Sequence, residues 1–332
     1  MIKVSVVVPC FNEEHTITLL LDALNNQTYP REQMEVIVAD GLSTDRTRQK
    51  ITAFQQQHSD LSLQVIDNPT RRIPTGLNLA INHAKGEFVV RLDAHSVPNE
   101  NYIQRSITNL EKNLGWNVGG VWDIHPANDS WIAHSIALAA AHPLGVGDAR
   151  YRFAEKASAV DTVPFGAFKR KLIDEIGPFD ESLLANEDYE FNLRIRRAGG
   201  TLWLDPAIRS KYFSRPTLPA LARQYTRYGY WKWQMLKRYP ASLRWRQALP
   251  PLFVLSLLLL PLLSLFWPAL LILWGLEVVS YALLLLIAGL HKGLQISKLW
   301  PLIGLPMAIT SMHISWGSAF LWSMLHTRFR KA

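Results

Sequence analysis

The chain of 332 residues is long enough for one large domain or two smaller ones, and its single cysteine, Cys10, excludes an intramolecular disulfide. Its formal net charge of +8 fits either nucleic acid or a membrane surface as a partner. The distribution of the basic residues argues against nucleic acid, because they are gathered directly before a long apolar tract.

The N-terminal part predicts a strand, a loop and a helix. Residues 4–9 (VSVVVP) form a β-branched run that is too short for a helix, and the polar loop CFNEE follows. Apolar residues at helical spacing then predict a helix over residues 16–24. Because the first apolar run is short and lacks a small-residue cleavage site, we expect no signal peptide and a cytoplasmic first domain.

Strands and helices continue to alternate after this helix. A second strand over residues 35–40 ends in Asp40, and residues 41–45 predict a turn in which Ser43 or Thr44 caps the next helix. A third strand near residues 61–66, a helix near 75–83 and a strand from Glu87 follow. This alternation predicts an α/β fold with a doubly wound, mostly parallel sheet.

The strand from Glu87 carries the first candidate site. Its sequence, EFVVRLDAHS, passes from apolar residues to Arg91, Asp93 and His95. Ligands of open α/β sheets bind outside the carboxyl ends of the strands, and Asp93 and His95 point to the same side if the strand geometry continues that far. Such a pair can hold one divalent ion that bridges a diphosphate. In the alternative interpretation Asp93 caps a turn and His95 is solvated.

Asp40 lies at the same predicted edge as Asp93, and two acids at that edge suit a nucleotide. One carboxylate can bind the ribose or base while the other acts with a metal on the phosphates. The chain has no glycine-rich phosphate loop. We therefore expect the metal to hold the diphosphate, with Arg71 and Arg72 as a supplement unless both arginines are simply solvated.

The middle of the chain is less regular. Residues 118–123 predict a strand, residues 131–141 a helix of small residues, and residues 142–159 a flexible loop over the site. Gly166 either permits close approach of a ligand to the backbone or is a plain turn glycine. Residues 186–190 open another helix, where an acid such as Asp188 either interacts with the helix dipole or accepts a proton from a sugar hydroxyl.

Beyond residue 204 the chain becomes basic and then apolar. Residues 206–276 contain no Asp or Glu and include the cations Arg209, Lys211, Arg215, Arg223, Arg227, Lys232, Lys237, Arg238, Arg244 and Arg246. Residues 218–239 predict a basic, aromatic helix at a membrane interface or, alternatively, an ordinary surface helix. This charge pattern fits attraction to anionic lipid.

Three apolar segments follow, over residues 251–267, 269–290 and 299–325. Each approaches the roughly 20 residues that a membrane crossing needs. We favour three crossings, although these place Arg328, Arg330 and Lys331 outside, against the positive-inside trend. In the alternative, the first two segments form a hairpin that does not cross fully. Glu277 and His313 lie inside the apolar tracts and are candidates for lining an acceptor path.

Five motifs in this order resemble the family 2 inverting glycosyltransferases of GT-A fold. They are Pro9-Cys10-Phe11-Asn12-Glu13-Glu14, Asp40-Gly41-x-Ser43-x-Asp45, Arg91-x-Asp93-Ala94-His95, Glu187-Asp188 and Gln224-x-x-Arg227-Tyr228. The Asp-Ala-His form looks most like the exopolysaccharide glucosyltransferases of the succinoglycan biosynthesis type. Asp161-Thr162-Val163, Phe165-Gly166 and the three hydrophobic segments add to this resemblance, which covers almost the whole chain.

The resemblance implies a role for each matching residue. The implied nucleotide-binding residues, with Arg72 as the supplement named above, are Pro9, Phe11, Asn12, Glu14, Asp40, Arg72, Asp93 and Ala94. Asp93 and His95 would hold the metal, and because His95 stands where most of the family has a second Asp, Mn²⁺ is expected as readily as Mg²⁺. Asp188 resembles the general base. The residues implied for the acceptor or phosphate are Gly166, Glu187, Gln224, Arg227 and Tyr228, with Tyr228 in place of the family's Trp.

The predicted function is transfer of a sugar, glucose from a UDP-sugar in the first instance, to a polyprenyl-diphosphate-linked saccharide. Single displacement with Asp188 as base would invert the anomeric carbon. The predicted organisation is a GT-A domain over residues 1–215, a basic amphipathic helix over 216–248 and a membrane domain over 249–326, held in the inner membrane with the catalytic domain in the cytoplasm. The alternatives are a processive β-glycan synthase, which would usually carry more membrane spans, and a catalytically silent scaffold.

Overall fold

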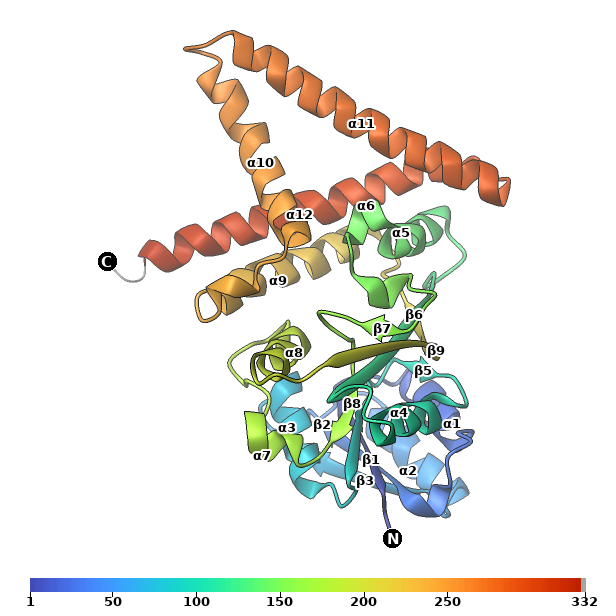
Figure 1. The fold of residues 1–332 in the computed structure, drawn as a ribbon. Helices are drawn as coiled ribbons and strands as arrows, with labels where there is room; N and C mark the ends of the chain where they lie inside the picture. The colour runs from blue at the N-terminus through green and yellow to red at the C-terminus, as the bar shows by residue number, and fades with distance from the viewer. Residues whose placement is uncertain (330–332) are drawn as a thin grey trace. The chain divides into compact units, whose positions relative to one another are not determined.

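The computed structural model describes residues 1–329, which form two compact units (Figure 1). The first unit comprises Met1–Asp123 and Arg150–Tyr212, and the second comprises Ile124–Ala149 and the chain from Phe213 onwards. Arg330 and Lys331, whose charges entered the prediction of membrane orientation, lie outside the described residues. The three-part division drawn from the sequence stays a prediction.

The first unit alternates strands and helices, as the sequence predicted. Its strands are β1 (Val4–Cys10), β2 (Met34–Asp40), β3 (Ser62–Asp67), β4 (Phe88–Arg91), β5 (Val97–Pro98), β6 (Asn117–His125), β7 (Ser158–Ala159), β8 (Ala167–Lys169) and β9 (Leu202–Phe213), of which β6 and β9 run slightly past its ends. Its helices are α1 (Ile17–Asn25), α2 (Thr47–Gln57), α3 (Ile73–His83), α4 (Tyr102–Glu111), α7 (Leu172–Ile176) and α8 (Glu187–Arg197), with short 3-10 turns η1 (Arg31–Gln33) and η2 (Arg150–Arg152).

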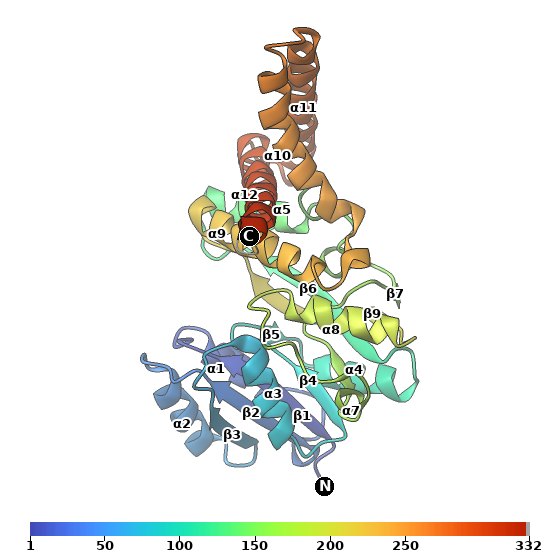
Figure 2. The same cartoon turned by 90° about the vertical axis from the view of Figure 1, so that its left-hand side faces the viewer.

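These strands form one mixed sheet. Within the described chain its order is β3-β2-β1-β4-β8-β6-β9-β5, with β7 paired to β9. Strands β3, β2, β1 and β4 are parallel neighbours, and Figure 2 shows β3, β2 and β1 side by side. Strand β8 pairs antiparallel with β4 and β6. The predicted α/β sheet is confirmed, and its parallel part ends at β4.

The register of the parallel strands gathers polar residues at one edge of the sheet. Cys10 at the end of β1 lies opposite Asp40 at the end of β2, while Arg91 at the end of β4 lies opposite Val7 of β1. Parallel neighbours run in one direction, so their carboxyl ends meet at the same edge. The loops after β1, β2 and β4 therefore start from one edge, as the sequence predicted.

Helices cover both faces of the sheet. Successive side chains of β1 point to opposite faces and so belong to two different buried clusters. Val6 and Val8 pack with residues of α1, α2 and α4 in one buried cluster, whereas Val7 packs with residues of α3, α7 and α8 in the other. Figure 1 shows α3 and α7 on one side of the sheet and α1, α2 and α4 on the other. Burial of each valine side chain stabilises the folded state by about 1.5 kcal/mol or more. The two cores therefore hold the strands, and with them the strand ends, in place.

One expectation for the middle of the chain is corrected. Residues 142–159 are not one flexible loop, because they contain helix α6 (Pro143–Val146), η2 and strand β7, which pairs with β9. The first basic residues after Leu204 lie in the sheet, since β9 continues to Phe213. Its cations Arg209 and Lys211 alternate with the buried Ile208 and Ser210, which is the period-2 pattern of a strand with one solvated face.

The second unit is helical. Besides α6 it contains α5 (Trp131–Ala141), α9 (Leu218–Leu236), η3 (Pro240–Ser242), α10 (Trp245–Leu263), α11 (Ala269–Ile296) and α12 (Pro301–Phe329). Among residues 1–329, α10 and α11 are the helices long and apolar enough to cross a membrane. The sequence predicted three such segments, so the structure provides two candidates where three were expected.

Helix α12 contains the third apolar segment, but one side of it is buried by protein. Leu305, Ile309 and Met312 of α12 form a core with residues of α5, α9 and α11. Gly229 of α9 lies against the backbone of α12, where an added Cβ would stand 2.3 Å from the Trp316 carbonyl oxygen. Close backbone packing of this kind is typical of helix contacts mediated by small residues. Packing by the protein itself thus explains much of the apolar character of α12.

The two ionisable residues of the apolar tracts have polar partners on neighbouring helices. The Ser256 hydroxyl of α10 donates to Glu277 Oε1 of α11 over 2.6 Å. Tyr281 Oη of α11 lies 3.0 Å from His313 Nδ1 of α12. Such pairing lowers the cost of a polar group in an apolar tract. A role for either residue in an acceptor path stays a prediction.

Candidate active site

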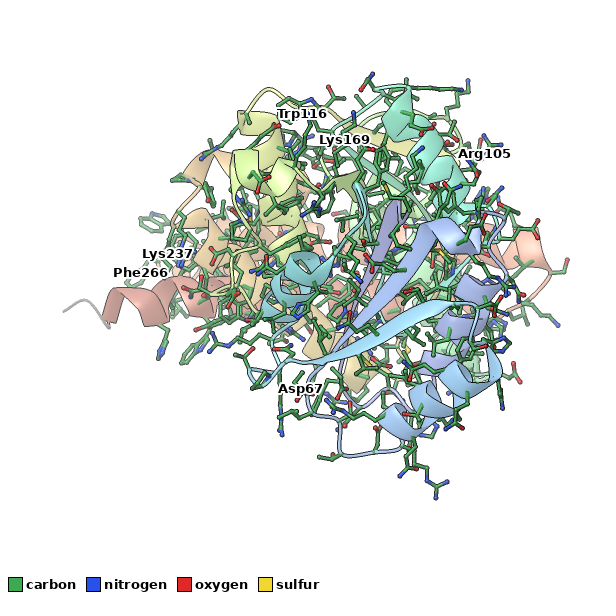
Figure 3. All side chains as sticks on the ribbon, turned by 90° about the horizontal axis from the view of Figure 1, so that it is seen from below. Asp67, Arg105, Trp116, Lys169, Lys237 and Phe266 are labelled. Atoms are coloured by element: carbon green, nitrogen blue, oxygen red, sulfur yellow. The ribbon has the colours of Figure 1, made fainter. Side chains whose placement is uncertain are left out.

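Asp40 is fully buried at the end of β2, where it holds the loop that follows. Its two oxygens accept the Ser43 N–H over 3.0 Å and the Ser43 hydroxyl over 2.5 Å, and Arg48 Nε of α2 donates over 2.5 Å. Arg48 Nη2 also donates to Oδ1 of Asp67 over 2.5 Å. Asp67, which is labelled in Figure 3, ends β3. The predicted cap is therefore wrong: α2 begins at Thr47 without a side-chain cap, because Ser43 is bound to Asp40 instead.

The loop after β1 is joined to the loop after β2 by two of its predicted nucleotide residues. Pro9 lies within β1, and Asn12 and Glu14 both form hydrogen bonds across the loops. These bonds include Asn12 N–H to Ser43 Oγ (2.8 Å), Thr44 N–H to Asn12 Oδ1 (2.9 Å), Glu14 N–H to Asp45 Oδ2 (3.1 Å) and Arg46 N–H to Glu14 Oε2 (3.1 Å). The structure thus unites the first two sequence motifs in one surface.

Phe11 presents a flat aromatic face beside these loops. Its ring is 40% exposed, packs against Gly41 and lies 5.2 Å from the Arg71 guanidinium. An exposed aromatic ring next to a cation can stack on a nucleobase. Arg72, the other half of the predicted pair, points elsewhere, because its Nη1 lies 3.5 Å from the Glu181 carbonyl oxygen. The structure therefore places Arg71 rather than Arg72 beside Phe11.

Strand β4 ends before the predicted metal residues. It stops at Arg91, and the Asp93 carbonyl accepts the Ser96 N–H over 2.9 Å and the Ser96 hydroxyl over 2.7 Å. Asp93 and His95 therefore occupy a turn, so strand alternation does not apply to them. Ala94 between them is buried in the sheet core, which anchors the turn.

His95 is oriented by a residue that the sequence analysis did not single out. Its Nδ1 lies 3.1 Å from Glu13 Oε1, and Thr16 Oγ1 donates to Glu13 Oε2 over 2.5 Å. Glu13 belongs to the loop after β1, so this contact ties the first motif to the Asp-Ala-His turn. The two residues are 82 positions apart in the sequence.

Arg91, which the sequence motif contained without an assigned role, lies at the centre of a buried charge cluster. Only 3% of it is exposed. Its Nη2 donates to Glu187 Oε1 over 2.8 Å and lies 3.3 Å from Asp93 Oδ1, while Nε and Nη1 have no hydrogen-bond partner among the described residues. Burial lowers the pKa of Arg91, but the charges of Asp93, Glu187 and Asp188 outweigh this effect and raise the pKa overall. Arg91 is therefore a permanent cation among three acids.

Asp188 stands in the first turn of α8, next to the acid that Arg91 holds. Asn186 adopts a left-handed conformation (φ 65°) before the helix, and Glu187 is buried while Asp188 is partly buried. Burial and the neighbouring Glu187 charge raise the pKa of Asp188 to about 6, against an opposing effect of Arg91. A carboxyl group with this pKa can accept a proton near neutral pH.

Gly166 supports β4 from the neighbouring chain. Its carbonyl accepts the Arg91 N–H over 2.9 Å. Its φ is +95°, and an added Cβ would lie 2.4 Å from Asn117 Oδ1, so the backbone requires glycine here. The Asn117 side chain is itself held by Asn192 of α8 over 2.7 Å. This packing explains why position 166 is a glycine. The predicted contact of Gly166 with a ligand stays a prediction.

The remaining predicted site residues lie on α9. Gln224 Nε2 donates to Tyr228 Oη over 3.1 Å, one helical turn apart, and Arg227 is exposed on the same helix. All three belong to the second unit, whereas the residues from Pro9 to Asp188 named above belong to the first. Their role towards acceptor or phosphate stays a prediction.

The Asp-Ala-His turn suits a divalent ion that is shared with a ligand. Within residues 1–329 no cluster of three or more His, Cys, Asp or Glu side chains forms a complete metal site. Asp93 and His95 supply a carboxylate and an imidazole, a donor set that Mn²⁺ accepts. The Glu13 carboxylate behind His95 is the kind of partner that metal-bound histidines have. The residues therefore fit a metal that a diphosphate would complete.

Comparison with known proteins agrees with this arrangement. The sequence profile of "Glycosyl transferase family 2" matches residues 5–177. The dolichyl N-acetyl-alpha-D-glucosaminyl phosphate 3-beta-D-2,3-diacetamido-2,3-dideoxy-beta-D-glucuronosyltransferase of Methanococcus voltae is 28% identical over 249 residues, covering 73% of this chain and 76% of the relative. The succinoglycan biosynthesis protein ExoA of Rhizobium meliloti is 27% identical over 247 residues, covering 74% of this chain and 73% of the relative.

A solved structure has the same fold. The mannosyltransferase PcManGT from Pyrobaculum calidifontis, in complex with GDP-Man and Mn²⁺, superposes with a TM-score of 0.64. The match covers 96% of this chain and 87% of that chain at 20% identity. At this identity the likeness shows the fold alone, which is the predicted GT-A type with C-terminal apolar helices.

Proposed function

Because this chain belongs to glycosyl transferase family 2, we propose that it is a membrane-bound, inverting enzyme. It transfers a sugar from a nucleoside-diphosphate sugar to a lipid-linked saccharide during cell-surface glycan synthesis, and UDP-glucose is the first donor to test. The dolichyl phosphate acceptor in the name of the Methanococcus voltae relative supports the lipid-linked acceptor. ExoA, named for succinoglycan biosynthesis, supports the product class.

The observation that carries the proposal is the buried Arg91 cluster. Arg91 contacts both Asp93, on the turn predicted for the donor and metal, and Glu187, which precedes Asp188. One guanidinium thus fixes a donor-side acid and the acid next to the candidate base. Fixed relative positions of donor and base are what a direct displacement requires.

In the reaction that we propose, Asp188 accepts the proton of an acceptor hydroxyl. The hydroxyl oxygen attacks the anomeric carbon as the bond to the diphosphate breaks, and an α-linked donor gives a β-linked product. The loops of Phe11, Asn12 and Asp40 bind the nucleoside. Asp93 and His95 would hold a divalent ion, which supplies positive charge to the departing diphosphate.

The charge pattern supports a cytoplasmic catalytic unit in the plasma membrane. If α10 and α11 both cross, the chain returns to the side from which it started. The basic helix α9 before them and Arg328 after them then share one side. This arrangement satisfies the positive-inside trend, which three crossings would break.

Two other functions have less support. A processive β-glycan synthase would usually carry an intact Gln-x-x-Arg-Trp motif, whereas this chain has Tyr228 in place of the Trp. A silent scaffold would gain nothing from a buried charge cluster, because desolvating charges is costly. Retention of Asp93, His95 and Asp188 in one unit favours the enzyme.

The pH dependence of transfer should report the ionisation of Asp188. A general base must be ionised, and the raised pKa places its ionisation near pH 6. We expect kcat/KM to be level at higher pH and to fall about tenfold per pH unit below the pKa. Initial rates between pH 5 and 8 at low donor concentration test this expectation. A rate that stays level down to pH 5 would remove Asp188 from the role of base.

Release of nucleoside diphosphate tests the proposal as a whole. Detergent-purified protein is offered UDP- and GDP-sugars with membrane lipid extract and Mn²⁺, Mg²⁺ or EDTA. We expect release from one donor, with loss of nearly all of it in EDTA and recovery when excess metal is added. No release from any donor with either metal would support the scaffold, whereas release that persists in EDTA would refute the metal.

A further inference from the structure

Glu13 stands where a partner for the histidine of the metal turn is needed. An aspartate can bind a metal through either carboxylate oxygen. An imidazole binds only when one ring nitrogen faces the metal and carries no proton. Glu13 Oε1 lies 3.1 Å from His95 Nδ1. Donation from Nδ1 to the carboxylate fixes the tautomer in which Nε2 carries the lone pair.

Glu13 is itself held in place from several directions. Thr16 Oγ1 donates to its Oε2 over 2.5 Å, and the Glu13 N–H donates to Thr47 Oγ1 of α2 over 2.8 Å. Its side chain is partly buried, at 25% exposure. Because these hydrogen bonds restrain the Glu13 carboxylate, it can fix the orientation of the His95 imidazole.

We propose that Glu13 is a positioning residue that orients His95 for a divalent metal and ties metal binding to the nucleotide loop. The inference rests on the metal site of the proposed function. It assigns Glu13 a role different from that of its neighbours Asn12 and Glu14, which hold the loop after β2. It also explains how a turn with histidine in place of a second carboxylate can keep its affinity for metal.

A purely structural role for Glu13 is the competing explanation. The Glu13 carbonyl accepts the N–H groups of Thr16 and Ile17 at the start of α1, over 3.0 and 2.9 Å. These backbone bonds do not depend on the side chain. A structural role of the carboxylate would act through Thr16, and its loss would not depend on which residue occupies position 95.

The test is Mn²⁺ binding to the purified full-length protein in the presence of UDP or GDP, measured by electron paramagnetic resonance of free Mn²⁺. We expect Glu13→Gln to weaken Mn²⁺ binding by about 10- to 100-fold, the usual effect of losing a histidine's outer partner. Glu111→Gln, at an exposed glutamate paired with Lys3, is the matched control and should leave binding unchanged.

The comparison of Glu13 with Gln at position 13 is then repeated in a protein that carries Asp at position 95. In the His95→Asp background a carboxylate needs no tautomer to be fixed, so Glu13→Gln should change Mn²⁺ affinity by less than about threefold. Equal losses in both backgrounds, or no loss in the wild-type background, would overturn the inference while leaving the metal site intact. Absence of Mn²⁺ binding by the wild-type protein would overturn the metal site, and this inference with it.

Discussion

Asp188→Asn is expected to lower the turnover of sugar transfer by about 10²- to 10⁴-fold, the usual contribution of a general base. Asparagine fills the same space but cannot accept the proton of the acceptor hydroxyl. Donor binding should change little, because the residues proposed for the nucleoside lie on the loops after β1 and β2. The measurement is kcat with saturating donor and lipid extract, beside the donor KM.

Stability provides the internal control for this variant. The pKa of Asp188 is higher in the folded protein than its usual value, so ionisation of the carboxyl opposes folding increasingly as the pH rises from the usual value to about 6, and the full cost is present above that pH. Asparagine removes that cost, and we expect the melting temperature at pH 7.5 to be unchanged or higher. Asp174→Asn, at an exposed acid in the first turn of α7, should keep full activity. Full activity of Asp188→Asn would refute the assignment.

Arg91→Met should strongly destabilise the first unit. It leaves Glu187 buried without its cation, and breaking a buried pair on one side costs about 3–5 kcal/mol of unfolding free energy. Chemical unfolding in detergent, followed by tryptophan fluorescence, measures the loss. Arg31→Met, which breaks the exposed pair with Asp60, should cost about 1 kcal/mol or less.

A second substitution separates lost charge pairing from lost packing. Arg91→Met combined with Glu187→Gln removes both charges of the buried pair, and we expect it to recover part of the stability that Arg91→Met loses. Sugar transfer should stay low in the double variant, because the contacts of Arg91 with Asp93 and with Glu187 are both lost. If Arg91→Met were as stable as the wild-type protein, the buried cluster could not be the element that fixes donor and base.

The sequence predicted the parts of the site that follow from local pattern. Asp40 and the turn after Arg91 were found because buried strands ended in polar residues. The acids that open a helix left Asp188 open between a helix-dipole role and a base, and its assignment as base came from the family resemblance and stays a prediction. The register of β1, β2 and β4 then brings the loops to one edge, as parallel strands must.

The sequence could not supply the contacts between distant residues. Arg91 and Glu187 are 96 positions apart, so no local pattern indicated that they form a buried ion pair. Glu13 looked like one acid of a polar loop until the structure showed its contact with His95. The predicted Ser43 cap failed for the same reason, because Asp40 competes for the Ser43 hydroxyl.

Helix α12 shows that an apolar segment of the sequence need not be covered by lipid. Helix α12 is apolar over much of its length, yet Leu305, Ile309 and Met312 are covered by protein. Composition does not distinguish a helix face buried by protein from one that faces lipid. Among the described residues, α10 and α11 are the helices long and apolar enough to cross a membrane by length and composition.

Transfer of label from donor to lipid tests the central claim most directly. Full-length protein is incubated with membrane lipid extract, Mn²⁺ and the radiolabelled sugar of the donor that supports nucleotide release. We predict that label enters the organic phase with the wild-type protein and that Asp188→Asn reduces this transfer by at least about 100-fold. Nucleotide release with all of the label left as free sugar in water, or equal transfer by Asp188→Asn, would contradict the account.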